Sequence, residues 1–107
     1  MRMSSNRKII EKCKAILADH YGERFAGLYL YGSVARRQDV PGSDIDLLVL
    51  LEEPFDFFKE LRTMIELLYA VQLRSDQLIS AKPVLRHEFE AGKLHFYRTI
   101  QREGVAA

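Results

Sequence analysis

Hydrophobic residues recur at helical spacing over the first part of the chain. Between Asn6 and about Tyr21 they fall on one face of a helix, and Gly22 is a suitable residue to end it. The residues that form this face are Ile9, Ile10, Cys13, Ile16 and Leu17. A short apolar and aromatic run from Leu28 to Tyr31 follows and predicts a strand.

The middle of the chain carries the strongest strand signal. The segment Asp44–Leu51 contains an unbroken apolar run, Leu47–Leu51, which is typical of a strand covered on both faces. A short helix is predicted before it over Val34–Gln38. After Pro54 the apolar residues return to helical spacing from Phe55 to about Val71, which predicts a long helix packed on the sheet.

The last third of the chain predicts one more strand and further helices. The strand falls within Val71–Ile79, and from Val84 onward the pattern fits one broken or two short helices, with Gly92 as the interruption. This order of elements indicates an α/β (α+β) domain with a small mixed β-sheet flanked by helices. Because a strand–helix–strand crossover normally joins parallel strands, the strand in Val71–Ile79 is expected to run parallel to Asp44–Leu51.

Length and composition fit one soluble globular domain, residues 1–107. The chain is 48% hydrophobic and 29% charged, and no linker or repeat divides it. The formal net charge of +1 gives no general electrostatic case for binding nucleic acid or an anionic membrane. Because Cys13 is the single cysteine, and neither a signal peptide nor a membrane-spanning run is recognised, we expect a cytoplasmic protein.

The informative motif is Gly32-Ser33, ten residues, then Asp44-Ile45-Asp46. Residues two apart on a strand point to the same face, so Asp44 and Asp46 would place two carboxylates side by side. Keeping both ionised requires a cation, and oxygen ligands favour a hard ion such as Mg²⁺. An isolated Asp-x-Asp is more often a solvated strand end, so the neighbouring residues decide the interpretation.

The segment that precedes the acidic pair contains four residues that could bind phosphate. Gly32 allows close approach of the backbone, the Ser33 hydroxyl and the following amides can bind phosphate oxygens, and Arg36 and Arg37 could add a bidentate contact. If the two flanking strands are antiparallel neighbours, this phosphate cradle faces the carboxylates. The unit then predicts a nucleoside triphosphate site.

In these motifs the chain resembles the minimal nucleotidyltransferases of the polymerase-β superfamily. More closely, it resembles the minimal nucleotidyltransferase antitoxins that are paired with HEPN-domain toxins. The segments that carry the resemblance are Tyr31–Arg36, Ser43–Val49 and Phe96–Val105. The resemblance implies the polymerase-β-like nucleotidyltransferase fold and transfer of AMP from ATP to a hydroxyl group, with two Mg²⁺ ions.

The family also has a third carboxylate on a later strand, and Asp76 is the matching residue here. The resemblance implies that Asp44, Asp46 and Asp76 are the catalytic metal ligands, with Asp76 helping to activate the acceptor. Gly32 and Ser33 would position the β- and γ-phosphates. The alternative for Asp76 is an ordinary surface residue of a polar loop, and Gln77 stands where the family usually has an apolar residue.

Three functions are compatible with the sequence. In the first, the protein is an adenylyltransferase that AMPylates a partner protein, a cognate HEPN ribonuclease toxin, and so neutralises it. In the second, it is an antitoxin that binds and occludes the toxin without chemistry. The third, transfer to a small molecule or to RNA, ranks last because such relatives normally carry an added acceptor-binding domain. The exposed part of Phe55–Phe58 and the last helix are the expected partner surfaces.

Overall fold

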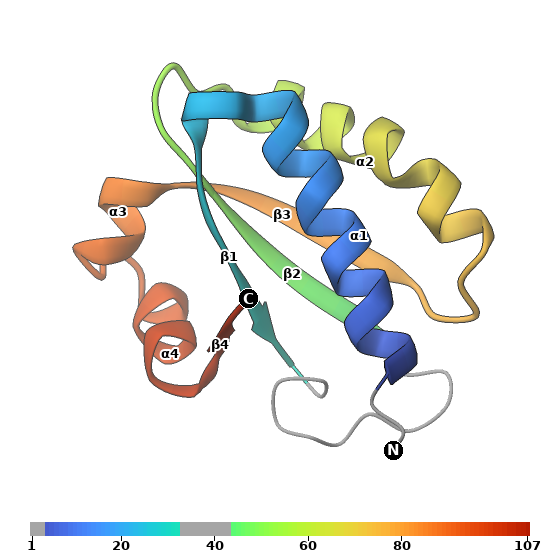
Figure 1. Ribbon diagram of the computed structural model, residues 1–107. Coiled ribbons are helices and arrows are strands. Elements are labelled where there is room, and N and C mark those ends of the chain that lie inside the picture. Colours follow the sequence, from blue (N-terminus) through green and yellow to red (C-terminus); the bar gives the residue numbers. More distant parts are fainter. Residues whose placement is uncertain (1–3, 33–43) are drawn as a thin grey trace.

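The computed structural model describes residues 4–32 and 44–107. In that part of the chain it contains four α-helices, a short 3₁₀ helix and four strands (Figure 1). Their bounds are α1 Ser4–Tyr21, η1 Gly22–Arg24, β1 Phe25–Tyr31, β2 Ile45–Leu51, α2 Phe57–Leu73, β3 Ile79–Leu85, α3 Arg86–Glu90, α4 His95–Glu103 and β4 Val105–Ala106.

The four strands form one mixed sheet in the order β3-β2-β1-β4. Strand β1 is antiparallel to both β2 and β4, whereas β2 and β3 are parallel and are joined by the crossover helix α2. The register pairs Tyr31 of β1 with Asp46 of β2, and Asp46 in turn with Ser80 of β3. The last residues of β1 therefore lie beside the first residues of β2.

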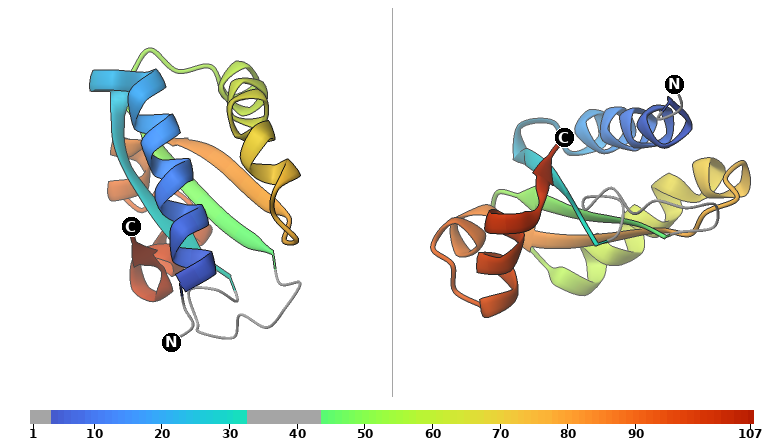
Figure 2. Two further views of the ribbon diagram at one scale, coloured as in Figure 1. Left: turned by 45° about the vertical axis from the view of Figure 1, so that its right-hand side comes forward. Right: turned by 90° about the horizontal axis from the view of Figure 1, so that it is seen from below.

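Helices cover both faces of the sheet (Figures 1 and 2). On one face α1 and α2 pack on the odd-numbered residues of β2, and on the other α3 and α4 pack on Leu48 and Leu50. The first cluster is Ile10, Cys13, Leu17, Tyr21, Leu28, Ile45, Leu47, Val49, Leu51, Met64 and Leu68, and the second adds Val84, Phe89 and Ile100. Every residue of β2 except Asp46 is buried, as its unbroken apolar run predicts.

The α/β class, the mixed sheet and the parallel pairing of the third strand are confirmed. The position of that strand was predicted wrongly. Residues 71–73 belong to α2, and β3 begins only at Ile79. Val71 continues the helical spacing of Met64 and Leu68 and packs against the same cluster, so its apolar side chain belongs to the helix.

The C-terminal helices follow the prediction, with one addition. Gly92, at φ +66°, separates α3 from α4 as expected, although Val84 and Leu85 belong to β3. After α4 the residues Val105 and Ala106 form β4, a strand that the sequence pattern did not predict. It pairs with β1 and so fixes the end of α4 beside that strand. Among the described helices, none has the length and apolar character needed to cross a membrane.

A buried carboxylate anchors the start of α2. Glu60 is 5% exposed, accepts a hydrogen bond from the Tyr21 hydroxyl at 3.0 Å and forms an ion pair with Arg24 at 2.8 Å. Asp56 caps the same helix, since its side chain accepts from the Lys59 amide at 3.2 Å. These contacts join α2 to α1 and to the segment before β1.

Leu48→Ala is expected to destabilise the protein strongly. Leu48 is fully buried in the centre of β2, so truncation leaves a cavity and should cost about 2–5 kcal/mol of unfolding free energy. Urea titration followed by circular dichroism measures the change. Leu94→Ala is the control, because Leu94 is 51% exposed and its truncation should cost under about 0.5 kcal/mol. Equal losses in the two variants would contradict the packing described here.

Candidate active site

The two carboxylates of the acidic pair lie at the start of β2. Asp44 is exposed and immediately precedes the strand, whereas Asp46 is half-buried within it. Burial raises the pKa of Asp46, the charge of Asp44 raises it further, and Lys82 lowers it in part. The two side chains are thus close enough to repel one another, and that of Asp46 is partly removed from solvent.

At Gly32 the end of β1 lies directly against Asp46 of this pair. Its φ of +79° is one that side-chain-bearing residues rarely adopt, and a Cβ atom placed there would lie 2.5 Å from Oδ2 of Asp46. The positive φ favours glycine, and a side chain at this position would have to displace the Asp46 carboxylate. The glycine of the motif therefore suits both the backbone conformation and the observed place of that carboxylate.

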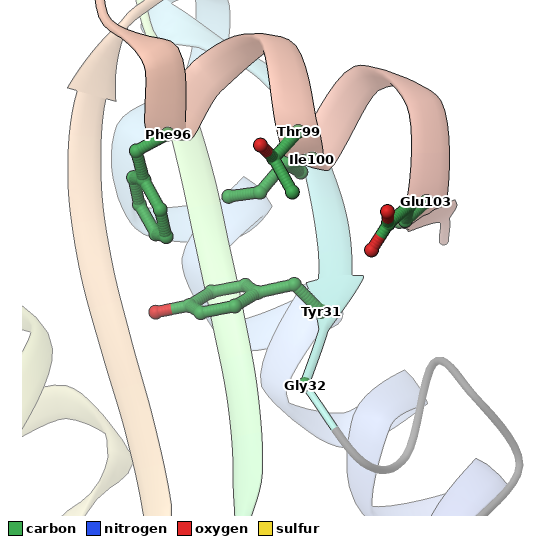
Figure 3. Close-up of a pocket in the computed structure, with 7 residues that line it drawn as sticks. Tyr31, Gly32, Phe96, Thr99, Ile100 and Glu103 are labelled. Atoms are coloured by element: carbon green, nitrogen blue, oxygen red, sulfur yellow. The ribbon is translucent and has the colours of Figure 1, made fainter.

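A small pocket adjoins the pair, between the end of β1 and α4 (Figure 3). Tyr31 and Phe96 face one another in it, with ring centroids 5.4 Å apart and planes at 86°. Burial raises the pKa of the Tyr31 phenol, and the charge of Asp46 raises it further. Thr99 and Glu103 line the pocket from α4.

Strand β3 supplies the other side of the site. Ser80 is the register partner of Asp46, and Lys82, two residues later, projects from the same face of the strand. The Lys82 ammonium lies 5.7 Å from the centroid of the Phe96 ring, within the range of a cation–π contact. Lys82 thus places a positive charge between the carboxylates and the aromatic pocket.

Asp76 lies at the same edge of the sheet but outside the strand. It is exposed, in the loop between α2 and β3. The Ile45 amide donates to the Leu78 carbonyl at 2.8 Å, which fixes this loop beside the start of β2. Within residues 4–32 and 44–107, no three His, Cys, Asp or Glu side chains gather as a metal-binding group. The described acidic site is therefore a pair.

Of the remaining predicted site residues, Ser33, Arg36 and Arg37 lie outside the described residues. Sequence reasoning gave no role to Tyr31, Phe96 or Lys82. Tyr31 directly precedes the glycine of the motif, which is a usable signal. Phe96 and Lys82 join the site only through the packing of α4 and the register of β3, so no local pattern could have indicated them.

The donor set fits a hard divalent cation. Asp44 and Asp46 offer only carboxylate oxygens, the ligands that Mg²⁺ prefers. The charge of Asp44 raises the pKa of Asp46, and a bound cation would relieve this repulsion. Two carboxylates are also a usual protein contribution to Mg²⁺ when a nucleotide supplies the other ligands.

A comparison with known protein families assigns the chain to a family. Residues 11–101 match the family model described as polymerase beta, nucleotidyltransferase. The chain belongs to this family. No curated protein matches the chain in sequence.

Solved structures agree on the fold. A proposed nucleotidyltransferase from Sulfolobus solfataricus is similar with a TM-score of 0.56 and 17% identity, over 92% of this chain and 76% of that one. A chain of a toxin–antitoxin structure solved with AMP-PNP is similar with a TM-score of 0.54 and 17% identity, over 90% and 70%. The mixed sheet flanked by helices is thus the polymerase-β-like nucleotidyltransferase fold.

Gly32→Ala is expected to destabilise the nucleotidyltransferase domain by about 1–3 kcal/mol, because strain at positive φ of about 1–2 kcal/mol adds to the cost of displacing the Asp46 carboxylate. Gly22→Ala is the matched control, since Gly22 has φ +57° and a Cβ there meets nothing within 4 Å. Chemical unfolding measures both variants. In the Asp46→Ala background, the part of the Gly32→Ala cost that comes from the contact with Asp46 should disappear, whereas the cost of Gly22→Ala should not change. An equal cost at both glycines in the wild-type background would refute the close contact.

Asp46→Asn is expected to raise thermal stability at pH 7. Because folding raises the pKa of Asp46 above its unfolded value, its ionisation costs folding free energy at neutral pH. That cost disappears as the pH falls through the raised pKa, so the advantage of the variant should shrink in acid. Differential scanning calorimetry between pH 4 and 7, without divalent cations, measures the trend. A variant less stable than the wild type at pH 7 would contradict the raised pKa of Asp46.

Proposed function

We propose that this nucleotidyltransferase transfers AMP from ATP to a hydroxyl of a partner protein, a HEPN ribonuclease toxin, and thereby acts as its antitoxin. The observation that carries the proposal is the approach of Gly32 to the carboxylate of Asp46, with Asp44 alongside. This brings the end of β1, which is proposed to bind phosphate, against the two side chains that are proposed to hold the metal ion. Family membership and the similarity to a toxin–antitoxin protein support it.

In the proposed reaction, Asp44 and Asp46 would hold Mg²⁺, which would neutralise the charge that develops on the phosphates. The acceptor hydroxyl forms a bond to the α-phosphorus of ATP, and the bond to pyrophosphate breaks. The hydroxyl proton leaves to a base. The backbone at Gly32 lets the triphosphate approach, and Ser33, Arg36 and Arg37 are proposed to bind its phosphates.

Lys82 is well placed to assist the same reaction. Its positive charge lowers the pKa of Asp46 in part, and its ammonium lies beside the Phe96 ring. A cation in this position favours binding of the triphosphate and departure of pyrophosphate.

One observation favours the second candidate, an antitoxin that acts by occlusion. The described acidic group is a pair without a converging third carboxylate, whereas the proposed reaction uses Asp76 as well. A protein of this kind would bind the same toxin without transferring AMP.

Transfer of label distinguishes the two functions. The purified protein is incubated with Mg²⁺ and α-labelled ATP in a lysate of its source cells, beside the Asp44→Asn, Asp46→Asn variant. One labelled protein with wild type and none with the variant is the expected result, and mass spectrometry identifies the acceptor. If neither protein transfers label while both capture the same partner, the protein acts by occlusion and the enzymatic proposal fails.

Asp76→Asn tests the proposed third carboxylate. If Asp76 acts as base or second metal ligand, transfer should fall by about 100-fold or more while the protein stays folded. Asp19→Asn, on α1, is the control for a change of charge alone. Initial rates of labelling measure both variants. An unchanged rate in Asp76→Asn would remove Asp76 from the reaction and leave the Asp44–Asp46 pair as the acidic site.

A further inference from the structure

Strand β3 places three side chains on the face of the sheet that carries Asp46. They alternate along the strand with Ile79 and Ala81, which pack against the first core cluster on the opposite face. The three residues are Ser80, Lys82 and Val84. Val84 belongs to the second core cluster, whereas Ser80 and Lys82 are exposed. The sheet is therefore open to solvent on this face, next to Asp46.

None of these three side chains is a carboxylate. The resemblance to minimal nucleotidyltransferases implies two Mg²⁺ ions held by three carboxylates, but Asp76 lies in the loop before β3 and is exposed. Over residues 4–32 and 44–107, no third acid converges on Asp44 and Asp46. Ser80, the register partner of Asp46, offers only a neutral hydroxyl. The donor set therefore fits one Mg²⁺ ion and lacks the ligands for a second.

Lys82 supplies a positive charge at this side of the site instead. It is the next residue after Ser80 on the face of β3 that carries Asp46. Burial and the charge of Asp44 raise the pKa of Asp46, and the charge of Lys82 lowers it in part. The Lys82 ammonium is thus near enough to stabilise the ionised carboxylate.

The ammonium is also available to a ligand. It lies 5.7 Å from the centroid of the Phe96 ring, and Phe96 in turn contacts Tyr31 at the end of β1. Among the described residues, Lys82 forms no ion pair with a carboxylate. Its N–H groups can therefore donate to phosphate oxygens of a nucleotide bound at the acidic pair.

A count of charges supports an exchange of a metal ion for this lysine. Two aspartates, Lys82 and one Mg²⁺ carry the same formal charge as three aspartates with two Mg²⁺ ions. A triphosphate would meet the same total charge in either arrangement. Neutralising the phosphate charge is a main task of the cations in phosphoryl transfer, and a lysine can share it.

We propose that Lys82 takes the place of the second metal ion, so that the site binds one Mg²⁺ per nucleotide. The inference rests on the proposed function and deepens it. Lys82 would contact the phosphates of ATP, while the acceptor hydroxyl would lose its proton to a base without binding a metal ion. The role left for Asp76 in the reaction is that base.

Counting bound ions tests this proposal without relying on AMP transfer. Mn²⁺, which suits the same oxygen ligands as Mg²⁺, is titrated into an equimolar mixture of the full chain and a non-hydrolysable ATP analogue, at concentrations well above the dissociation constant. Electron paramagnetic resonance measures the free Mn²⁺. The wild type should bind one Mn²⁺ per nucleotide complex. Lys82→Asp should bind two, because it adds a third carboxylate on the face of Asp46.

Two further variants complete the test. Lys12→Asp makes the same change of charge at an exposed position of α1, on the opposite side of the sheet, and should still bind one Mn²⁺. Lys82→Gln should also bind one, but it should bind the analogue about tenfold more weakly because a charged hydrogen bond to phosphate is lost. Circular dichroism confirms that each variant is folded.

Three results would overturn the proposal: two Mn²⁺ ions per complex in the wild type, a single ion in folded Lys82→Asp, or unchanged affinity for the analogue in Lys82→Gln. The AMP-transfer assay separates it from the proposed function. One bound ion without transfer to any acceptor contradicts the enzymatic function alone. Transfer by a wild-type complex that holds two ions contradicts the role of Lys82 alone, and a complex that binds no Mn²⁺ contradicts both.

Discussion

The arrangement of this domain depends on β2, a strand buried on both faces that has a carboxylate, Asp46, as its second residue. Helices must cover both sides of the sheet because the residues of β2 on either side of the backbone are apolar. The same burial removes water from Asp46 and raises its pKa. The site is thus a consequence of placing a charge at the open end of the central strand, where β1 ends against it and β3 begins beside it.

This placement costs stability in the free protein. A half-buried carboxylate next to a second negative charge is unfavourable in the free protein, and a divalent cation with a triphosphate would convert that repulsion into binding. Gly32 permits the backbone to approach the carboxylate, and Lys82 supplies a positive charge at the opposite side. Functional sites commonly store unfavourable energy in this way, held in place by the surrounding core.

Sequence reasoning succeeded where a residue's role depends on its immediate neighbours. The apolar run of β2, the helical stripe of α2 and the break at Gly92 are local patterns, and each was predicted. It failed for β3, because an apolar residue such as Val71 suits a helix as well as a strand, and only its packing against the first core cluster distinguishes the two. The participation of Phe96 and Lys82 depends on how α4 and β3 meet the sheet, which no spacing in the chain reveals.

Asp44 and Asp46 are proposed to form a cation-dependent nucleotide site. Calorimetric titration of the purified protein with a non-hydrolysable ATP analogue, first with Mg²⁺ and then with a chelator, tests this site. The analogue should bind only when Mg²⁺ is present, and the Asp44→Asn, Asp46→Asn variant should lose this binding while remaining folded. Equal affinity with and without Mg²⁺, in the wild type and the variant alike, would contradict it.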